Sequence, residues 1–170
     1  MKKIIVLVVL SLATMSALRA QNKMEPTASI TSKFEEQFNG ATDVQWGKAG
    51  KLFVANFHFR QSFRMAYYDQ DGNLVAKGRK VPEAQLPMNI YDDLQTARTN
   101  CERKSGPLVT GSIYEFSRES GETEYVTTLE NEQMKITLLS QGGKLGIQRK
   151  EAKHNTLEAH GNLIAKAPEN

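Results

Sequence analysis

The chain has 170 residues, of which 39% are hydrophobic, 24% charged and 8% aromatic. This composition is ordinary for a globular protein and argues against collagen, a coiled coil and wholesale disorder. The length suits one compact domain, or two small repeats that share a core. A single cysteine excludes an intramolecular disulfide and any multi-cysteine metal site.

Residues 1–20 have the pattern of a Sec-type signal peptide. Lys2 and Lys3 form the positive start, the apolar run Ile4–Leu12 follows, and small residues lead to Ala20. The apolar run is too short to span a bilayer as a mature helix. We therefore expect cleavage after Ala20, with cleavage after Ala17 as the alternative, and a periplasmic or secreted protein.

The formal charge of +3 comes from this predicted signal peptide. Its three basic residues are its only charges, so their removal leaves 19 basic and 19 acidic residues. The exported protein is then near neutral, and the whole-chain pI of 8.9 is no evidence for nucleic acid binding. No later segment is long and apolar enough to cross a membrane. We expect no nucleic acid partner and no membrane span.

A short helix is predicted after the polar leader 21–28. Ile30, Phe34 and Phe38 recur every four residues, and either Ser29 or Thr31 can cap the start. The Asn-Gly pair at 39–40 ends the helix. Because so short a helix is not stable alone, its phenylalanine stripe must pack on another element.

That element is predicted to be a sheet of about four strands. In the strongest strand, Phe53, Ala55, Phe57 and Phe59 share one face, as the alternation of a half-buried strand requires. A hairpin turn at 69–73, with positive φ at Gly72, joins the last two strands. The predicted strands are 44–46, 51–60, 63–69 and 74–81.

The second half of the chain repeats this order. A helix is predicted over Met88–Cys101, because Ile90, Leu94 and Ala97 form an apolar stripe. Strand patterns follow at 108–118, 124–130, 134–139 and 144–149. Residues 151–170 carry few apolar side chains and are expected to form a flexible tail.

The two halves also match at residue level. A shift of 71 positions places 68–74 over 139–145, with Gln, Gly and Leu in common. We interpret this match as an internal duplication. The sequence therefore predicts an α+β fold, a tandem repeat of a helix packed on an about four-stranded antiparallel sheet. The repeats are placed at 27–82 and 83–150.

Several of these features occur in an order that is found in a known family. They are Phe34 and Phe38 on a helix, then Val44–Trp46, Phe53–Phe57, Ala66–Asp69 and Gly72, and Leu86-Pro87 before the second helix. This order resembles the exported PepSY-like proteins of Bacteroidetes, which are similar in fold to β-lactamase-inhibitor proteins. The resemblance covers roughly residues 30–150. The second half departs from it, with Ser140 and Gly142 where the first half has Asp69 and Asp71.

The resemblance implies the tandem helix-plus-sheet fold and no established activity. The PepSY name implies protease inhibition or control of a periplasmic peptidase, by analogy at the level of the fold.

No pattern of residues predicts an enzyme or a metal site. Asp69, Asp71 and Asn73 resemble the start of a calcium loop, but Gly72 stands fourth where such a loop needs glycine sixth. The three histidines lack zinc-ligand spacing, and no nucleophile, phosphate-loop or dinucleotide motif occurs. We expect a non-enzymatic protein without cofactors. The sole thiol, Cys101, is interpreted as partly buried, with a reactive thiol as the open alternative.

Charge is divided between the two halves. Residues 43–82 hold seven basic and three acidic side chains, whereas residues 113–140 hold two basic and six acidic ones. One interpretation is two solvated faces with weak pairing between the repeats. The other is a bipolar surface that orients a partner and speeds its docking. The aromatic residues of the first half are expected in the core, unless a set beside Trp46 forms an exposed patch.

The leading hypothesis is an exported interaction module that binds an unidentified protein or peptide through an open sheet face, as an inhibitor or chaperone of an envelope or extracellular enzyme. The alternative is a carrier of a small apolar or lipid-like ligand between helix and sheet, held by Phe34, Phe38, Phe57 and Tyr91. The residues predicted to contact the protein partner are Trp46, Arg60, Arg64, Tyr68, Lys77, Arg79, Glu122 and Glu124.

Overall fold

The computed structural model describes residues 25–153, so the predicted signal peptide and most of the predicted tail lie outside the described residues. In this range there are two α-helices, α2 (Ala28–Gln37) and α3 (Met88–Ser105), and a short 3-10 turn, η1 (Glu83–Gln85). The strands of the same range are β1 (Thr42–Ala49), β2 (Leu52–Phe59), β3 (Ser62–Tyr68), β4 (Leu74–Val81), β5 (Val109–Thr110), β6 (Ile113–Arg118), β7 (Thr123–Glu130), β8 (Met134–Gln141) and β9 (Lys144–Ala152).

The strands form one antiparallel sheet in the order β1-β2-β3-β4-β6-β7-β8-β9, with β5 paired to β7. Strands β4 and β6 join the two halves of the chain through six residue pairs, from Ala76↔Arg118 to Val81↔Ile113. The predicted α+β class with antiparallel strands is confirmed. Among the described residues there are nine strands in one continuous sheet, rather than two sheets of about four, and the duplication stays a prediction.

The additional strand arises at Gly111, where the predicted strand 108–118 is interrupted. A side chain at Gly111 would collide with Thr128 Oγ1 of β7, so the chain makes a close approach that only glycine permits. The Gly111 amide donates to the Thr128 carbonyl at 2.8 Å. The interruption separates the short β5 from β6.

Helix α2 covers the sheet of the first half. Its N-cap is Thr27, whose Oγ1 accepts from the Ile30 amide at 3.4 Å, rather than Ser29 or Thr31 as predicted. Ile30 and Phe34 are buried, and the Phe34 ring lies 4.9 Å from that of Phe57 on β2. The predicted phenylalanine stripe therefore packs on the predicted strand.

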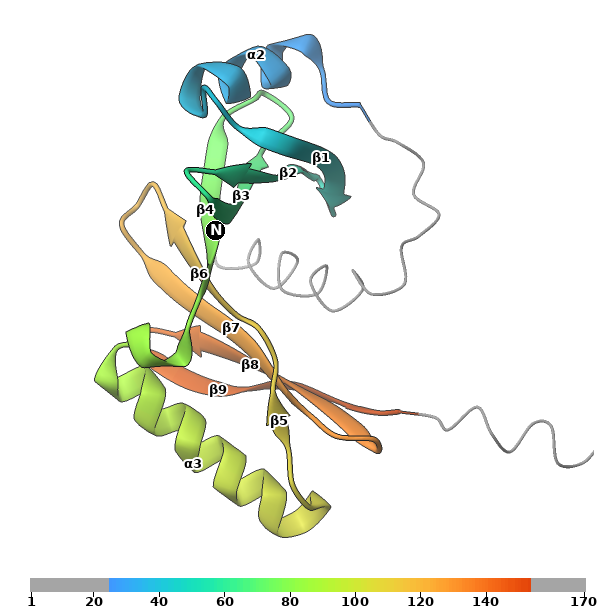
Figure 1. Cartoon of the computed structure of the whole chain (residues 1–170), viewed down its shortest axis with the longest axis vertical. Coiled ribbons are helices and arrows are strands. Elements are labelled where there is room, and N and C mark those ends of the chain that lie inside the picture. Colours follow the sequence, from blue (N-terminus) through green and yellow to red (C-terminus); the bar gives the residue numbers. More distant parts are fainter. Residues whose placement is uncertain (1–24, 154–170) are drawn as a thin grey trace, which may run out of the picture.

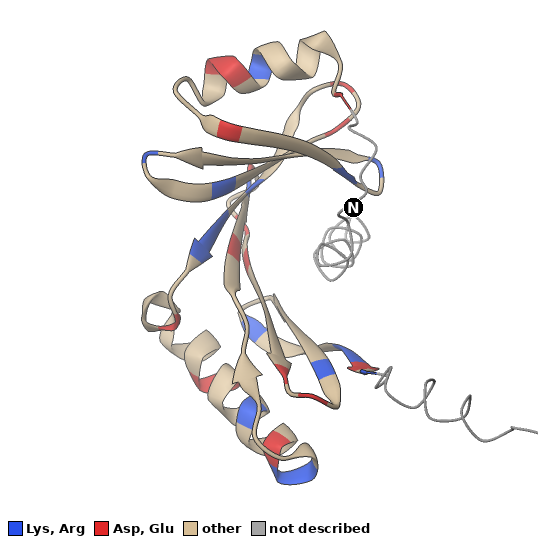
Figure 2. Ribbon diagram, turned by 45° about the vertical axis from the view of Figure 1, so that its right-hand side comes forward, with Lys and Arg blue, Asp and Glu red and all other residues tan. Residues whose placement is uncertain are grey.

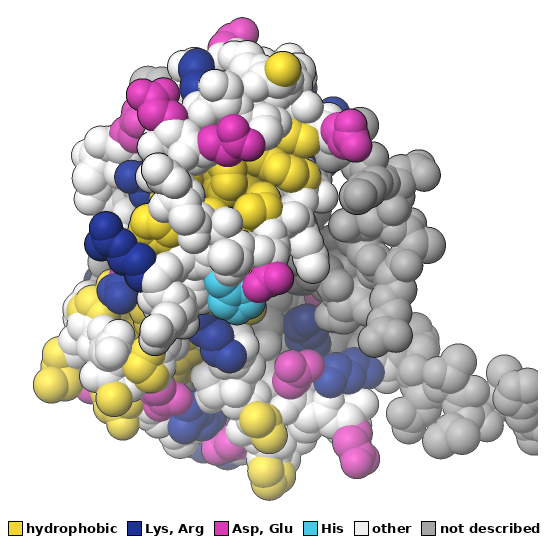
Figure 3. Space-filling model, turned by 45° about the horizontal axis from the view of Figure 1, so that its top comes forward, with side chains coloured by type: hydrophobic (Ala, Val, Ile, Leu, Met, Phe, Trp, Pro, Cys, Tyr) yellow, Lys and Arg dark blue, Asp and Glu magenta, His cyan; other side chains and the backbone are white. Residues whose placement is uncertain are grey.

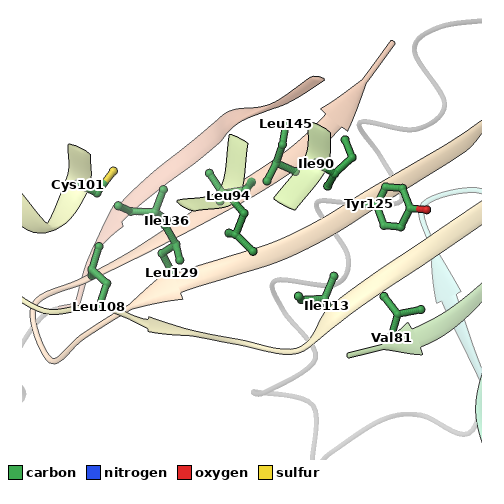
Figure 4. Packing of buried hydrophobic residues seen from close by; sticks show 11 residues of the cluster. Val81, Ile90, Leu94, Cys101, Leu108, Ile113, Tyr125, Leu129, Ile136 and Leu145 are labelled. Carbon is green, nitrogen blue, oxygen red and sulfur yellow. The ribbon is translucent and has the colours of Figure 1, made fainter. Parts of the chain in front are cut away.

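Helix α3 covers the sheet of the second half and is one turn longer than predicted. It ends where Gly106 takes a φ of 76°, so that the Gly106 amide can donate to the Glu102 carbonyl. Figure 4 shows Ile90 and Leu94 of the helix packed among Leu129, Ile136 and Leu145 of the strands. Cys101 is also buried in this core, in agreement with its structural interpretation.

A third apolar cluster lies on the opposite face of the sheet. Within residues 25–153 it consists of strand residues alone, drawn from both halves of the chain. It includes Val54, Met65 and Tyr67 from the first half, with Phe116 and Leu139 from the second. The two halves therefore share a core at their junction in addition to their hydrogen bonds.

Candidate interaction surface

One cross-strand row of side chains connects the two helix-covered cores. Phe57, Arg64, Arg79, Glu115 and Tyr125 are successive partners across β2, β3, β4, β6 and β7. Cross-strand partners point to the same face of a sheet. Phe57 belongs to the core under α2 and Tyr125 to the core under α3, so both helices lie on this face. Figure 1 shows the helices at opposite ends, with β4 and β6 between them.

The middle of this row lies between the two helices and is basic. Arg64 and Arg79 face each other across β3 and β4. Lys77 precedes Arg79 by two residues on β4, so its side chain lies on the same face. We call Arg64, Lys77 and Arg79 the basic strip. Figure 2 shows Lys and Arg on the strands that cross between the two halves.

Arg79 is held by a carboxylate from the other half of the chain. Its Nε donates to Glu115 Oε1 at 2.7 Å and its Nη2 to Glu115 Oε2 at 2.9 Å, which is a bidentate pair. Tyr125 Oη donates to the same Oε2 at 3.2 Å. These contacts fix the plane of the guanidinium group, although 41% of the Arg79 side chain is exposed.

The protonation equilibria of this group follow from the same contacts. The hydrogen bonds from Arg79 lower the pKa of Glu115, and those to Glu115 raise the pKa of Arg79. Burial, with the Glu115 charge, raises the pKa of Tyr125. The pair is therefore ionised at neutral pH.

The other two members of the basic strip are not neutralised in this way. Neither Arg64 nor Lys77 forms an ion pair with any residue of the range 25–153. Like charges directly opposite on neighbouring strands, as in Arg64 and Arg79, destabilise a sheet. One glutamate for three cations leaves an excess of positive charge on this part of the sheet.

Three of the other predicted residues lie elsewhere. Tyr68 is fully buried under α2, where its Oη donates to Gln37 Oε1 at 2.9 Å and burial raises its pKa to about 12. Trp46 is half-buried, 5.3 Å from the Phe34 ring. Arg60, in the β2–β3 turn, lies over the Phe59 ring at 5.2 Å. These residues are not part of the basic strip.

Of the two predicted acidic residues, Glu124 lies on the opposite face of the sheet and Glu122 lies beside it in the β6–β7 turn. Glu124 is the cross-strand partner of Phe116, which belongs to the third cluster. Arg118 pairs with both acids, at 3.3 Å to Glu122 and 3.4 Å to Glu124. They border a polar hollow of about 530 Å³, and burial raises the pKa of Glu124. The eight predicted residues thus do not form one surface.

The residues proposed for an apolar carrier are also separated. Phe34, Phe38 and Phe57 pack on one another, with ring centroids 4.8 to 5.3 Å apart. Tyr91 lies on α3, at the other end of the molecule. The four side chains therefore do not line one cavity.

Glu115 and Tyr125 are the two residues of the row around Arg79 that the sequence did not reveal as its partners. Each is separated from Arg79 by more than 30 residues, and only the β4–β6 pairing brings them together. Glu115 contributed to the acidic count of the second half, but no local spacing connects it with an arginine in the first half.

The hairpin predicted at Asp69 is present. Asp69 Oδ1 accepts from the amides of Asp71 and Asn73, and Gly72 has a φ of 79°. The carboxylate thus serves the turn itself. Within residues 25–153, no three His, Cys, Asp or Glu side chains are grouped in a way that could hold a metal ion. No helix of this range is long and apolar enough to cross a membrane.

Comparison with known proteins places the fold. No family model and no curated protein matches the sequence. A predicted periplasmic protein of Bacteroides eggerthii is similar in structure, with a TM-score of 0.62 and 13% identity over 76% of this chain and 90% of that one. A DUF2874 family protein of Bacteroides uniformis is also similar in structure, with a TM-score of 0.61 and 13% identity over 75% of this chain and 90% of that one.

A BLIP-like protein of Bacteroides fragilis is similar with a TM-score of 0.54 and 18% identity, over 79% of this chain and 91% of that one. At these identities the likeness shows the fold alone, and the periplasmic location belongs to the description of the Bacteroides eggerthii protein. The resemblance to PepSY-like proteins stays a prediction. This chain has a BLIP-like α+β fold.

Proposed function

We propose that this protein is an exported, non-enzymatic interaction module that binds an acidic surface of a protein or peptide through the basic strip. The observation that carries the proposal is the opposition of Arg64 and Arg79 on neighbouring strands, with Lys77 on the same face and a single glutamate among them.

The arrangement suits recognition of carboxylates. Arg79 is pre-oriented by Glu115, so less side-chain freedom is lost when its remaining donors meet a partner. Arg64 and Lys77 add charge that no residue of the range 25–153 neutralises by an ion pair. Complementary charge also increases the rate of association.

The strip lies between the two helices on the face of the sheet that they cover, whereas the sequence predicted an interaction on the face away from the helices. Strands hold these side chains in a fixed register, whereas loop residues would need to be ordered on binding. The similarity in fold to a BLIP-like protein makes an enzyme of the envelope or of the extracellular space the first class of partner to test.

The test is quantitative co-purification of the tagged protein from the envelope of its native host. The variant Arg64→Gln with Lys77→Gln removes two positive charges from the strip and leaves the Arg79–Glu115 pair intact. The control variant is Lys144→Gln with Lys150→Gln, which removes two exposed charges from β9. Thermal unfolding of each variant verifies that it is folded.

We expect the strip variant to lose a partner that the wild type and the β9 variant both retain. Equal recovery of every partner with all three proteins would contradict the proposal, because the strip would then contribute nothing to binding.

A further inference from the structure

The structure points to a second binding site, at the far end of the molecule from α3 and of opposite charge to the basic strip. We propose that a notch between α2 and β1 accepts the guanidinium or ammonium group of an arginine or lysine side chain from a protein partner. The notch has a volume of about 400 Å³ and is lined by Thr31, Phe34, Glu35, Phe38, Asn39, Gly40, Ala41, Val44 and Trp46.

The walls of the notch are aromatic and come from two elements. Thr31, Glu35 and Phe38 follow one another along one flank of α2 at one-turn spacing, which brings them to one side of the helix. Trp46 of β1 forms the opposite wall, with its ring centroid 5.3 Å from that of Phe34. Phe38 and Trp46 are both only half-buried, so their ring surfaces remain partly accessible.

The irregular start of β1 completes the floor. The register between β1 and β2 shifts between Thr42 and Gln45, and Asp43 takes a left-handed φ of 54°. Such a bulge redirects the side chains of an edge strand. Val44, which is 37% exposed, lines the notch together with Trp46 two residues further on.

The charge at this end of α2 is opposite to what helix stability favours. The last turn of α2 contains Glu35 and Glu36 and no basic residue. Cations stabilise the C-terminal end of a helix, where the backbone carbonyl groups create a negative potential, and anions destabilise it. Two carboxylates and the helix terminus therefore combine to attract a positive group.

The basic side chains near the notch make contacts with other groups. Lys33 donates from Nζ to the Asp71 carbonyl at 3.2 Å, Lys48 lies over the Phe53 ring, and Arg60 lies over the Phe59 ring. Figure 3 shows hydrophobic surface framed by acidic side chains at this end of the molecule.

Aromatic walls with a carboxylate at the rim select for an organic cation. Tryptophan is the best aromatic partner for a cation placed over its ring, and a nearby carboxylate such as Glu35 adds Coulombic attraction. An arginine side chain also has apolar methylene groups that can pack against Phe38 and Val44. Glu35 is the one carboxylate among the lining residues, whereas a Ca²⁺ site usually draws on several carboxylate and carbonyl oxygens.

The chain provides its own reporter for this site. Trp46 is the sole tryptophan, so its fluorescence reports on the notch without interference. We expect acetylated tri-arginine amide to change this fluorescence in a saturable and salt-sensitive manner. Tri-leucine and tri-glutamate of the same design should bind at least tenfold more weakly.

Variants localise the effect to the notch. Glu35→Gln should weaken tri-arginine binding by about three- to fivefold, the range of an exposed ion pair. Glu132→Gln, which removes an equal charge from the exposed β7–β8 turn, should leave it unchanged. Both variants replace an exposed carboxylate by an uncharged amide, which the fold should tolerate. Thermal unfolding verifies that each variant is folded.

Two results would overturn the inference. The first is the absence of a saturable change with tri-arginine. The second is an equal effect of the two variants, which would indicate attraction by overall charge. Each outcome is independent of the basic strip, which lies on other strands.

Discussion

At the scale of single residues, Glu115 connects the two halves of the molecule. Its carboxylate accepts two hydrogen bonds from Arg79 and one from Tyr125, and the pKa of Glu115 is lowered as a result. A carboxyl group with a lower pKa in the folded state stabilises the fold at pH values above its unfolded pKa of about 4.3. This stabilisation is lost as the pH falls through the lowered folded pKa.

We therefore expect Glu115→Gln to reduce the free energy of unfolding by a constant amount above about pH 5. The difference from the wild type should shrink below that pH, because the wild-type carboxyl group is then also neutral. Urea unfolding between pH 2.5 and 7 measures this difference. Glu132→Gln, at an exposed turn without an arginine contact in the described residues, is the control. A difference for Glu115→Gln that grows on acidification would show that the assigned ion pair is wrong.

Gly78 is a residue whose role is purely spatial. It lies on β4 at the junction, where an added Cβ would come within 2.8 Å of both Met65 Cε and Phe116 Cε1. Gly78→Ala should therefore destabilise the protein by about 1–3 kcal/mol through overpacking. Gly47→Ala is the matched control on β1, since nothing lies within 4 Å of its added Cβ. If chemical unfolding shows equal effects for both, the packing at the junction is looser than described.

At the scale of elements, most of the helices and strands could be predicted from the sequence, because their signals are local. The alternation of Phe53, Ala55, Phe57 and Phe59 predicts β2 and the face that packs under α2, but it does not predict that Leu52 and Val54 on the other face are buried as well. The break between β5 and β6 could not be predicted, since it depends on the approach of Gly111 to Thr128, a residue distant in sequence. The predicted helix ends at Cys101, whereas α3 continues to Ser105. The last turn is polar and carries no hydrophobic stripe that would predict it.

The start of α2 offers a direct test at this scale. Ser29 and Thr31 have suitable side chains for a cap, but the structure uses Thr27. Thr27→Ala should lower the free energy of unfolding by about 0.5–1 kcal/mol, because the Ile30 amide loses its acceptor. Ser29→Ala should have almost no effect, since Ser29 is exposed in the first turn. If thermal unfolding shows that Ser29→Ala is more destabilising than Thr27→Ala, the helix is capped by Ser29 and the assignment of Thr27 is wrong.

At the scale of the whole molecule, the candidate site depends on the pairing of β4 with β6. The excess of positive charge in the first half is a property of the sequence, but the face on which each charge lies depends on the strand pairing. The sequence gives the charges of Glu122 and Glu124 but not their position. Their ion pairs with Arg118 and the register of β6 with β7 show that they lie away from the basic strip. Tyrosine is a residue type that often contacts protein partners, but Tyr68 is fully buried in the core.

On the proposed function, acidic groups of the partner contact the basic strip. Carbodiimide forms an amide directly between a lysine amine and a carboxylate in contact, so it tests this claim at Lys77, which is exposed. Cross-linking is performed on the complex recovered from the native host, and the joined peptides are identified by mass spectrometry. Lys77→Arg retains the charge without the amine, and Lys144→Arg is the control on β9.

We expect Lys77 to be joined to an aspartate or glutamate of another protein. Lys77→Arg should abolish this cross-link while the partner is still recovered, and Lys144→Arg should leave it unchanged. A partner that stays bound but is joined to this protein only through lysines outside the basic strip would contradict the account.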